Sequence, residues 1–302
     1  MTSEKMTDEM NELYEIMNIY KLGRVRSIEL DELGLANHNY FVITDIDEYV
    51  VRFLVEQREE SLENDLAIHD QLEELSILTP VYIRLKGREY VHQGNSYPVV
   101  IMKKITGLHP TETDNELCFE MGTSLAQFHQ KVTNLPVNHQ GWFNKKKARL
   151  DLGEFRGVLQ TQIEELVIIG SEIFKQSLPK GIIHGDFNEN NILVDERDKY
   201  RISAMFDFEE TEFNILLIDF AWTLAVISRS KNGLSIDFSK VRSLIAGYTS
   251  VRPFTLSESK MLKQAVCYVE GVAVMWFVNN NYLSLAKEHV SRANYFRRKY
   301  SE

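Results

Sequence analysis

Apolar residues follow two different patterns along the chain. In residues 1–104 most apolar runs are short and strand-like, and turn residues such as those at 45–48 separate them. The predicted strands of this part span residues 24–30, 40–44, 49–55, 81–84, 89–92 and 97–102. Leucines at helical spacing predict one helix over residues 61–75, and a short amphipathic helix is expected over 8–19. The first part is therefore expected to be a small sheet with one inserted helix.

In residues 105–302 the apolar positions mostly recur at helical spacing. Long helices are predicted over 116–132 and 154–176, and the chain reads as almost entirely helical from 218 onward. A compact pair of strands is expected at 191–194 and 201–206. We therefore predict an α+β fold with two lobes, in which residues 1–104 form a β-rich lobe and residues 105–302 a mainly helical lobe. Such a layout places a ligand in the cleft between the lobes.

The strongest chemical signal is a loop that carries H-G-D-x-x-x-x-N, followed by a short hairpin and an apolar-D-F sequence. Its polar members are His184, Asp186, Asn191 and Asp207. In phosphoryl transfer the protein forms few covalent bonds itself. It positions two charged reacting groups and neutralises the negative charge on the phosphates.

These residues can be given roles. Asp186 is expected to orient a substrate hydroxyl and accept its proton, and Asn191 and Asp207 are expected to supply oxygen ligands to magnesium. The alternative is that these polar residues share a loop by chance, but the complete ordered set is far more specific than a single H-x-D.

This part of the chain resembles the aminoglycoside phosphotransferase-like superfamily of small-molecule kinases, which has the protein-kinase-like fold. The run 178–186 is similar to the family's approach to its catalytic aspartate, 125–129 to its helix ending in histidine, and 218–221 to its D-l-A segment. The resemblance covers nearly the whole chain and implies ATP and magnesium as cofactors. It also implies that Asp219 supports the catalytic loop without reacting, and that His129 is structural.

In the first lobe, residues 34–42 resemble the family's G-x-x-N-x-N turn, which replaces the glycine-rich loop of protein kinases. Gly34, Asn37 and Asn39 are therefore candidates for binding ATP phosphates, partly through backbone N–H groups. Alone this signal is weak, because glycine and asparagine are also ordinary hairpin residues.

Arg52 stands where kinases carry the strand lysine that contacts ATP phosphates, and an arginine binds phosphate with two donors. A solvated strand arginine is the alternative. An acidic partner for Arg52 is expected on the following helix, with Glu63 as first choice and Asp65 as second.

The strand at 97–102 is expected to lead into the hinge between the lobes. There the adenine of ATP would bind backbone groups near Met102, Lys103 and Ile105. Backbone recognition leaves no side-chain signature, so an ordinary core strand explains the same apolar run equally well.

Two departures from protein kinases indicate a small-molecule acceptor. Gly185 replaces the arginine that pairs with an activation-loop phosphate, and no A-P-E sequence follows Asp207.

Three segments are somewhat similar to homoserine kinases, namely 178–184, 37–42 and 274–277. Four acids near the motif, Glu189, Glu209, Glu210 and Glu212, would favour an amine-bearing acceptor such as an amino alcohol or aminoglycoside, although a solvated charged loop is equally compatible.

Composition narrows the remaining classes. The formal net charge of −10 argues against nucleic-acid binding, and the N-terminal residues contain no apolar signal core. No membrane span is expected, and two cysteines without a C-x-x-C spacing fit a reducing cytoplasm. A catalytically silent relative is the alternative class, because the phosphate-contacting lysine is replaced and Glu209 stands where protein kinases have glycine. Sequence leaves the oligomeric state open.

Overall fold

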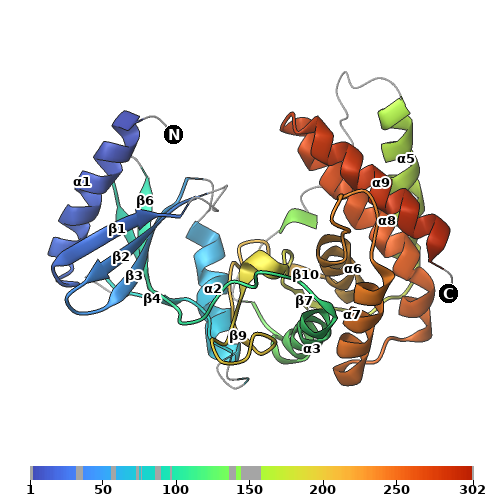
Figure 1. Cartoon of the computed structure of the whole chain (residues 1–302), viewed down its shortest axis with the longest axis horizontal. Helices are drawn as coiled ribbons and strands as arrows, with labels where there is room; N and C mark the ends of the chain where they lie inside the picture. Colours follow the sequence, from blue (N-terminus) through green and yellow to red (C-terminus); the bar gives the residue numbers. More distant parts are fainter. Residues whose placement is uncertain are drawn as a thin grey trace.

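The computed structural model describes residues 3–31, 37–55, 59–72, 75, 77–85, 90–95, 97–135, 141–143 and 158–300. The chain forms two lobes, a smaller one built on a β-sheet and a larger one built mainly from helices (Figure 1). The predicted α+β bilobal fold is therefore confirmed. Gly34 lies outside the described residues.

The smaller lobe contains an antiparallel sheet in the order β1-β2-β3-β6-β4, with β5 also paired to β6. Its strands are β1 (Val25–Leu30), β2 (His38–Thr44), β3 (Glu48–Phe53), β4 (Val81–Tyr82), β5 (Val91–Gln93) and β6 (Pro98–Lys103). Helices α1 (Ser3–Ile19) and α2 (Glu59–Leu72) complete this lobe.

Side chains of β6 alternate between the two faces of this sheet. Val99 and Ile101 are buried in a cluster with residues of α1, whereas Val100 and Met102 are buried in a cluster with Leu62 of α2. The two-residue period of the strand thus gives each helix its own apolar face. α2 lies on the side of the sheet that approaches the larger lobe (Figure 1).

The larger lobe packs long helices around one continuous apolar core. Its helices are α3 (Asn115–Lys131), α5 (Val158–Ser171), α6 (Leu216–Ile227), α7 (Phe238–Val251), α8 (Leu256–Asn279) and α9 (Leu283–Lys299). Two short antiparallel pairs carry the loops of interest, β7 (Lys180–Ile183) with β10 (Glu212–Ile215), and β8 (Ile192–Val194) with β9 (Ile202–Met205). The sequence pattern predicted neither β7 nor β10.

Leu78 makes a backbone connection between the lobes besides the chain itself. Leu78, which follows α2, donates its N–H to the carbonyl of Ser203 at 3.0 Å and accepts the N–H of Met205 at 2.9 Å. Within the larger lobe, Leu108, just after the hinge, forms an antiparallel bridge with Val194. The end of α2 is thereby tied to β9 immediately before the apolar-D-F sequence.

Helix α8 is long and apolar enough to cross a membrane by length and composition alone. Within its most apolar window, 72% of the residues are buried inside the protein. α8 packs against α5, α6 and α9 in the larger lobe (Figure 1). A buried core helix of a globular protein has these properties, and Glu270 in its middle is held by partners on α9.

Candidate active site

The carboxylate of Asp219 supports the loop between β7 and β8. Asp219 of α6 is fully buried, and its two oxygens accept the backbone N–H groups of His184 at 2.7 Å and Gly185 at 3.0 Å. The His129 ring lies 2.9 Å from the same carboxylate and bonds Tyr248 through its other nitrogen. Burial alone would raise the pKa of Asp219, but the bonds from His129 and the backbone outweigh it and lower the pKa. The structural roles expected for Asp219 and His129 are therefore confirmed.

Asp186 sits at the tip of this loop and is half-buried. Its Oδ1 accepts hydrogen bonds from Trp222 Nε1 at 2.8 Å and Asn188 Nδ2 at 2.9 Å, and its Oδ2 accepts one from Asn191 Nδ2 at 3.0 Å. Burial, followed by the negative charge of Asp207, raises the pKa of Asp186 to about 7. The carboxylate is thus oriented by three donors and lies within the field of a second acid.

The amide of Asn191 has a forced orientation. Its Nδ2 faces two acceptors, the Asp186 carbonyl at 2.8 Å and the Asp186 carboxylate, so the amide oxygen must point the other way. Asn191 itself is buried. An oxygen that is turned away from the base is available as a cation ligand, as the sequence prediction requires.

Asp207 adopts a left-handed backbone conformation, with φ of +68°. The next residue, Phe208, is fully buried, and it stacks on Phe128 with 6.0 Å between ring centroids and contacts the His184 ring at 4.9 Å. The buried phenylalanine fixes one side of the turn, which holds the Asp207 carboxylate out of the core. A strained backbone maintained by surrounding packing is common at functional sites.

The donor set of Asn191 and Asp207 fits magnesium. Magnesium binds through few protein oxygens together with phosphates and water, so an amide oxygen and one carboxylate suffice. The negative charge of Asp207 repels that of Asp186 and raises its pKa. A cation bound between the two carboxylates would offset this repulsion. Across the described ranges, no three His, Cys, Asp or Glu side chains converge as an all-protein metal cage.

Arg52 brings the smaller lobe into this site. Its Nε donates to Asn39 Oδ1 at 2.8 Å across the β2–β3 pair. Burial would lower the pKa of Arg52, but Tyr82 and the carboxylates of Asp207, Asp65 and Glu209 outweigh that effect and raise it. Charges from both lobes therefore meet around one guanidinium.

The acid that shares this environment is Asp65, so the choice of Glu63 as partner was wrong. Glu63 is exposed, whereas Asp65 is 4% exposed and accepts the Tyr82 hydroxyl at 2.5 Å. Burial raises the pKa of Asp65 to about 7, although the Tyr82 hydroxyl and the Arg52 charge oppose this. Residues two apart on a helix face nearly opposite directions, which explains why only one of the two can point inward.

Asn37 closes the end of the sheet. Its Oδ1 accepts the backbone N–H of Val55 at 3.0 Å, and the residue is buried. The described bonds of Asn37 and Asn39 are thus internal to the protein, and they shape the β2–β3 edge beside Arg52. The part of these residues in phosphate binding stays a prediction.

The predicted adenine contacts lie at the end of β6. Met102 is buried, with 3% exposure, between the sheet and α2, and Lys103 is an exposed residue that pairs with Asp47 at 2.8 Å. Ile105 follows, half-buried, in the connection to the larger lobe. Met102, Lys103 and Ile105 therefore occupy the hinge, and the adenine contact itself stays a prediction.

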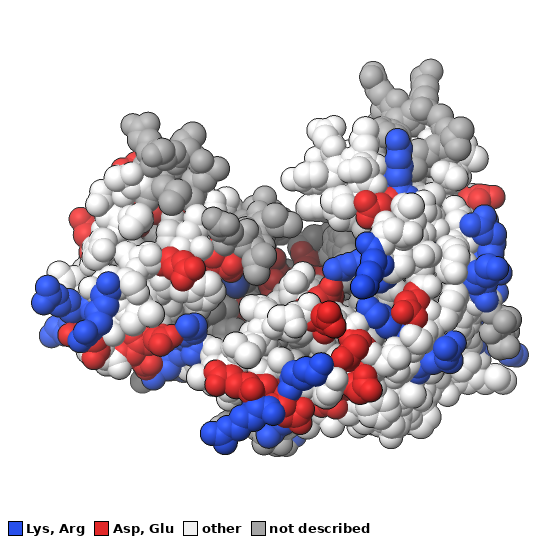
Figure 2. Space-filling view, viewed as in Figure 1, with Lys and Arg blue, Asp and Glu red and all other residues white. Residues whose placement is uncertain are grey.

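The four acids near the loop do not form a single exposed rim. Glu212 is fully buried in β10 and accepts a bond from Asn214, and Glu189 pairs with Arg229 at 2.5 Å. Glu209 and Glu210 are half-buried, and burial together with the charge of Asp207 raises the pKa of Glu209 to about 8. Figure 2 shows acidic side chains in the hollow between the lobes.

Trp222 is a site residue that the sequence interpretation missed. It lies one helical turn after Asp219 on α6, which places both side chains on the face that supports the loop. The spacing could have identified Trp222 from the sequence. Residues three positions apart lie on the same face of a helix, so a helix that contacts the loop through Asp219 also presents Trp222 to that loop.

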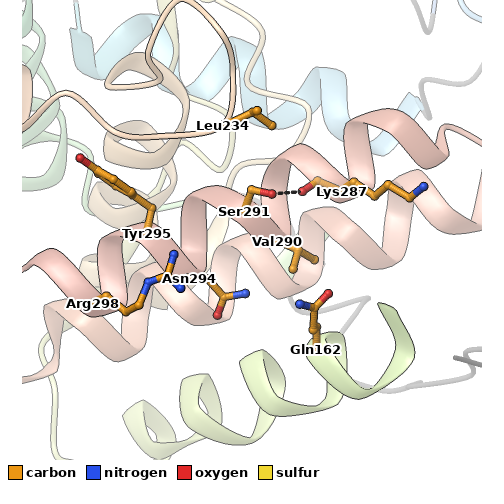
Figure 3. A pocket seen from close by; sticks show the side chains of 8 residues that line it. All are labelled: Gln162, Leu234, Lys287, Val290, Ser291, Asn294, Tyr295 and Arg298. Atoms are coloured by element: carbon orange, nitrogen blue, oxygen red, sulfur yellow. Dashed lines mark hydrogen bonds between the residues drawn. The ribbon is translucent and has the colours of Figure 1, made fainter. Parts of the chain in front are cut away.

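A separate pocket lies between α5 and α9, away from these residues (Figure 3). Its lining consists of Gln162, Leu234, Lys287, Val290, Ser291, Asn294, Tyr295 and Arg298. None of these residues belongs to the predicted site. The side chains of Lys287 and Arg298 point along the surface of α9 in different directions, so they do not converge on one ligand (Figure 3).

Comparison with known proteins agrees with this geometry. The profile of the phosphotransferase enzyme family matches residues 27–254, which include the loop, the hinge and Arg52. The chain belongs to the phosphotransferase enzyme family. This phosphotransferase is 24% identical over 249 residues to the homoserine kinase of Pseudomonas aeruginosa, covering 80% of the chain and 77% of that kinase. It is 27% identical over 259 residues to the homoserine kinase of Parvibaculum lavamentivorans, covering 82% and 78%. The protein is a small-molecule kinase.

Solved structures support the fold of this phosphotransferase. A microcompartment-associated aminopropanol kinase superposes with a TM-score of 0.77 at 18% identity, over 95% of this chain and 97% of that one. An amicoumacin kinase in complex with AMP-PNP, Ca²⁺ and its antibiotic gives a TM-score of 0.71 at 11% identity, over 96% of both chains. At such identities the likeness concerns the fold alone.

Proposed function

We propose that this phosphotransferase moves the γ-phosphoryl group of ATP to a hydroxyl of a small, amine-bearing molecule, with magnesium as cofactor. The observation that carries the proposal is the Asp186 carboxylate, which is held by Trp222, Asn188 and Asn191 beside Asp207. A carboxylate oriented in this way is suited to take one proton from a hydroxyl.

Each side chain of the site has a task in this proposal. Asp186 accepts the proton of the acceptor hydroxyl and orients the hydroxyl oxygen toward the γ-phosphorus of ATP. Arg52, anchored by Asn39, neutralises charge on the ATP phosphates from the smaller lobe. Magnesium, held by Asn191 Oδ1 and Asp207, would neutralise charge that develops on the phosphates.

ATP as the donor is supported by the relatives' ligands. The amicoumacin kinase was solved with AMP-PNP, and a hygromycin-bound aminoglycoside phosphotransferase was solved with ADP. The hinge at Met102, Lys103 and Ile105 is the segment where adenine would meet backbone groups. Another aminoglycoside phosphotransferase was solved with GDP, so GTP is the donor to compare directly.

An amino alcohol is the acceptor class we favour over an aminoglycoside. The two relatives described above are named homoserine kinases, and the aminopropanol kinase is named for another small amino alcohol. Glu209 and Glu210 are half-buried near Asp207, and an ammonium group bound beside Glu209 would lower its raised pKa and pair with the carboxylate so formed. The fully buried Cys118 and Cys267, both free, fit an enzyme of the reducing cytoplasm.

The decisive experiment measures ADP release with magnesium and ATP, or GTP, over a panel of acceptors. The panel holds homoserine, 1-amino-2-propanol, hydroxylysine, choline and several aminoglycosides, and Asp186→Ala runs beside the native protein. We expect stimulation by a small amino alcohol that is absent in Asp186→Ala, with the phosphorylated product identified by mass spectrometry. Magnesium-dependent nucleotide binding without transfer to any acceptor would favour a catalytically silent relative, and absence of such binding would refute the proposal.

A further inference from the structure

Helix α6 contacts four consecutive residues of the catalytic loop. Asp219 accepts the backbone N–H groups of His184 and Gly185, and Thr223 donates to the Phe187 carbonyl at 2.8 Å. Between these backbone contacts, Trp222 reaches the side chain of Asp186. The first and last contacts fix the backbone, and the Trp222 contact alone acts on the carboxylate itself.

The geometry of this contact is that of a charge-assisted hydrogen bond. The indole N–H of Trp222 donates to Asp186 Oδ1 at 2.8 Å, and Trp222 is 8% exposed. Indole N–H is a donor only, so this bond favours the ionised, accepting form of the oxygen. The bond lowers the pKa of Asp186 and opposes the effects of burial and Asp207.

The two oxygens of Asp186 are therefore unequal. Oδ1 accepts two hydrogen bonds, from Trp222 and Asn188, whereas Oδ2 accepts one, from Asn191. Because a carboxylate oxygen has two lone-pair sites, Oδ2 keeps one site for the acceptor hydroxyl. The Trp222 bond thus selects which oxygen acts as the base.

Aromatic packing holds the indole in place. Trp142 meets the Trp222 ring edge to face at 4.8 Å between centroids, and Phe143 meets it at 6.1 Å. Such packing restricts the rotation of Trp222 about its side-chain torsions and aims its single donor at Asp186. The indole N–H of Trp142 has no hydrogen-bond partner among the described residues, so Trp222 is the tryptophan of this pair that acts on the loop.

We infer that Trp222 is a positioning residue for phosphoryl transfer, because its indole N–H fixes the Asp186 carboxylate with Oδ2 toward the acceptor hydroxyl. This inference rests on the proposed role of Asp186 as proton acceptor. Trp222→Phe removes the donor and keeps an aromatic ring, so the packing with Trp142 survives. Trp276→Phe is the matched control, because Trp276 lies on α8 and its ring contacts Phe277 and Tyr282.

Kinetics separate positioning from a general effect on stability. Trp222→Phe should lower kcat by about tenfold to a hundredfold, the range expected for a hydrogen bond to a charged group, with an unchanged KM for ATP. Trp276→Phe should keep the wild-type kcat. An unchanged kcat in Trp222→Phe, or an equal fall of kcat in Trp276→Phe, would overturn the inference.

A second measurement needs no acceptor. The chain has three tryptophans, so its ¹⁵N–¹H spectrum holds three indole signals, which single Trp→Phe variants assign. Asp186→Ala should shift the Trp222 signal upfield and leave the Trp276 signal in place. A Trp222 signal that does not respond would refute the contact even if the enzyme is active. Lack of transfer to every acceptor by the native protein would instead contradict the proposed function, and the indole signal would still decide whether Trp222 holds Asp186.

Discussion

Asp219 accepts the backbone N–H of His184 at 2.7 Å across 35 positions of sequence, and both residues are fully buried. The carboxylate also bonds the Gly185 N–H and the His129 ring, so each of its oxygens faces donors. The loop that carries Asp186 is therefore fixed by a fully buried carboxylate on α6.

Asp219→Asn should destabilise the protein by about 3 kcal/mol or more and lower kcat. The new amide nitrogen would face a donor, which leaves buried polar groups unpaired. Thermal unfolding and steady-state kinetics measure the two effects. Asp237→Asn is the control, since Asp237 caps α7 at the surface through the N–H of Ser239, and asparagine caps helices equally well. Equal stability of the two variants would contradict the supporting role of Asp219.

Asp65 and Glu63 offer a direct test of the Arg52 environment. At pH 8, above the pKa of Asp65 of about 7, Asp65→Asn should raise the KM for ATP on the order of tenfold, because a buried carboxylate whose charge acts on Arg52 is replaced by a neutral amide. Glu63→Gln makes the same chemical change on the exposed face of α2 and should leave KM unchanged. The KM for the acceptor serves as an internal reference. An effect of Glu63→Gln alone would restore the original assignment.

The difference between Glu63 and Asp65 shows what local pattern predicts and where it stops. Loop 184–191 and Asp207 were found because their chemistry is carried by short, ordered motifs. The Arg52 partner depends on how α2 rotates against the sheet. Leu62 is buried, and Asp65 lies three residues later on the same face, so the apolar stripe of the helix held the missing information.

Other contacts depend on tertiary packing. The Trp222 bond to Asp186 spans 36 positions and joins a helix to a loop, so the sequence signals it only through the three-residue spacing of Trp222 from Asp219 on α6. Glu212 belonged to an apparent acidic cluster in the sequence, but pairing of β10 with β7 buries it. Counting acidic residues in the sequence therefore overestimated how many carboxylates are exposed near the catalytic loop, because strand pairing decides which side chains reach solvent.

Gly185, which replaces the arginine of protein kinases, has a steric reason to be glycine. Its φ is +86°, and a Cβ at this position would lie 2.3 Å from the Glu210 carbonyl oxygen. Gly185→Ala should cost about 2 kcal/mol or more of stability and displace Asp186, with a large loss of kcat. Gly271→Ala is the control, because its Cβ would lie 3.3 Å from a Val167 methyl group within a helix. Normal kinetics of Gly185→Ala would show that the loop tolerates a side chain.

A buried ionic group in the larger lobe predicts how stability depends on pH. Glu270 of α8 is fully buried, and its oxygens lie 3.2 Å from Arg292 Nε and 2.5 Å from His289 Nδ1. Burial alone would raise the pKa of Glu270, but the charge of Arg292 and the contact with His289 outweigh it and hold the pKa below its ordinary value of 4.5. A carboxyl group whose folded pKa is depressed stabilises the protein above its unfolded pKa and loses that contribution as pH falls through the folded value.

Glu270→Gln should therefore be less stable than the native protein at pH 7 by about 3 kcal/mol, and the difference should shrink as pH falls below 4.5. Urea unfolding midpoints of both proteins between pH 7 and the acid limit of folding measure this convergence. Glu172→Gln removes a surface pair with Lys175 and should change stability by at most about 0.5 kcal/mol at any pH. A stability gap for Glu270→Gln that stays constant across this pH range would mean that the pKa of Glu270 is the same in the folded and the unfolded protein, because only a difference between these two values makes the gap depend on pH.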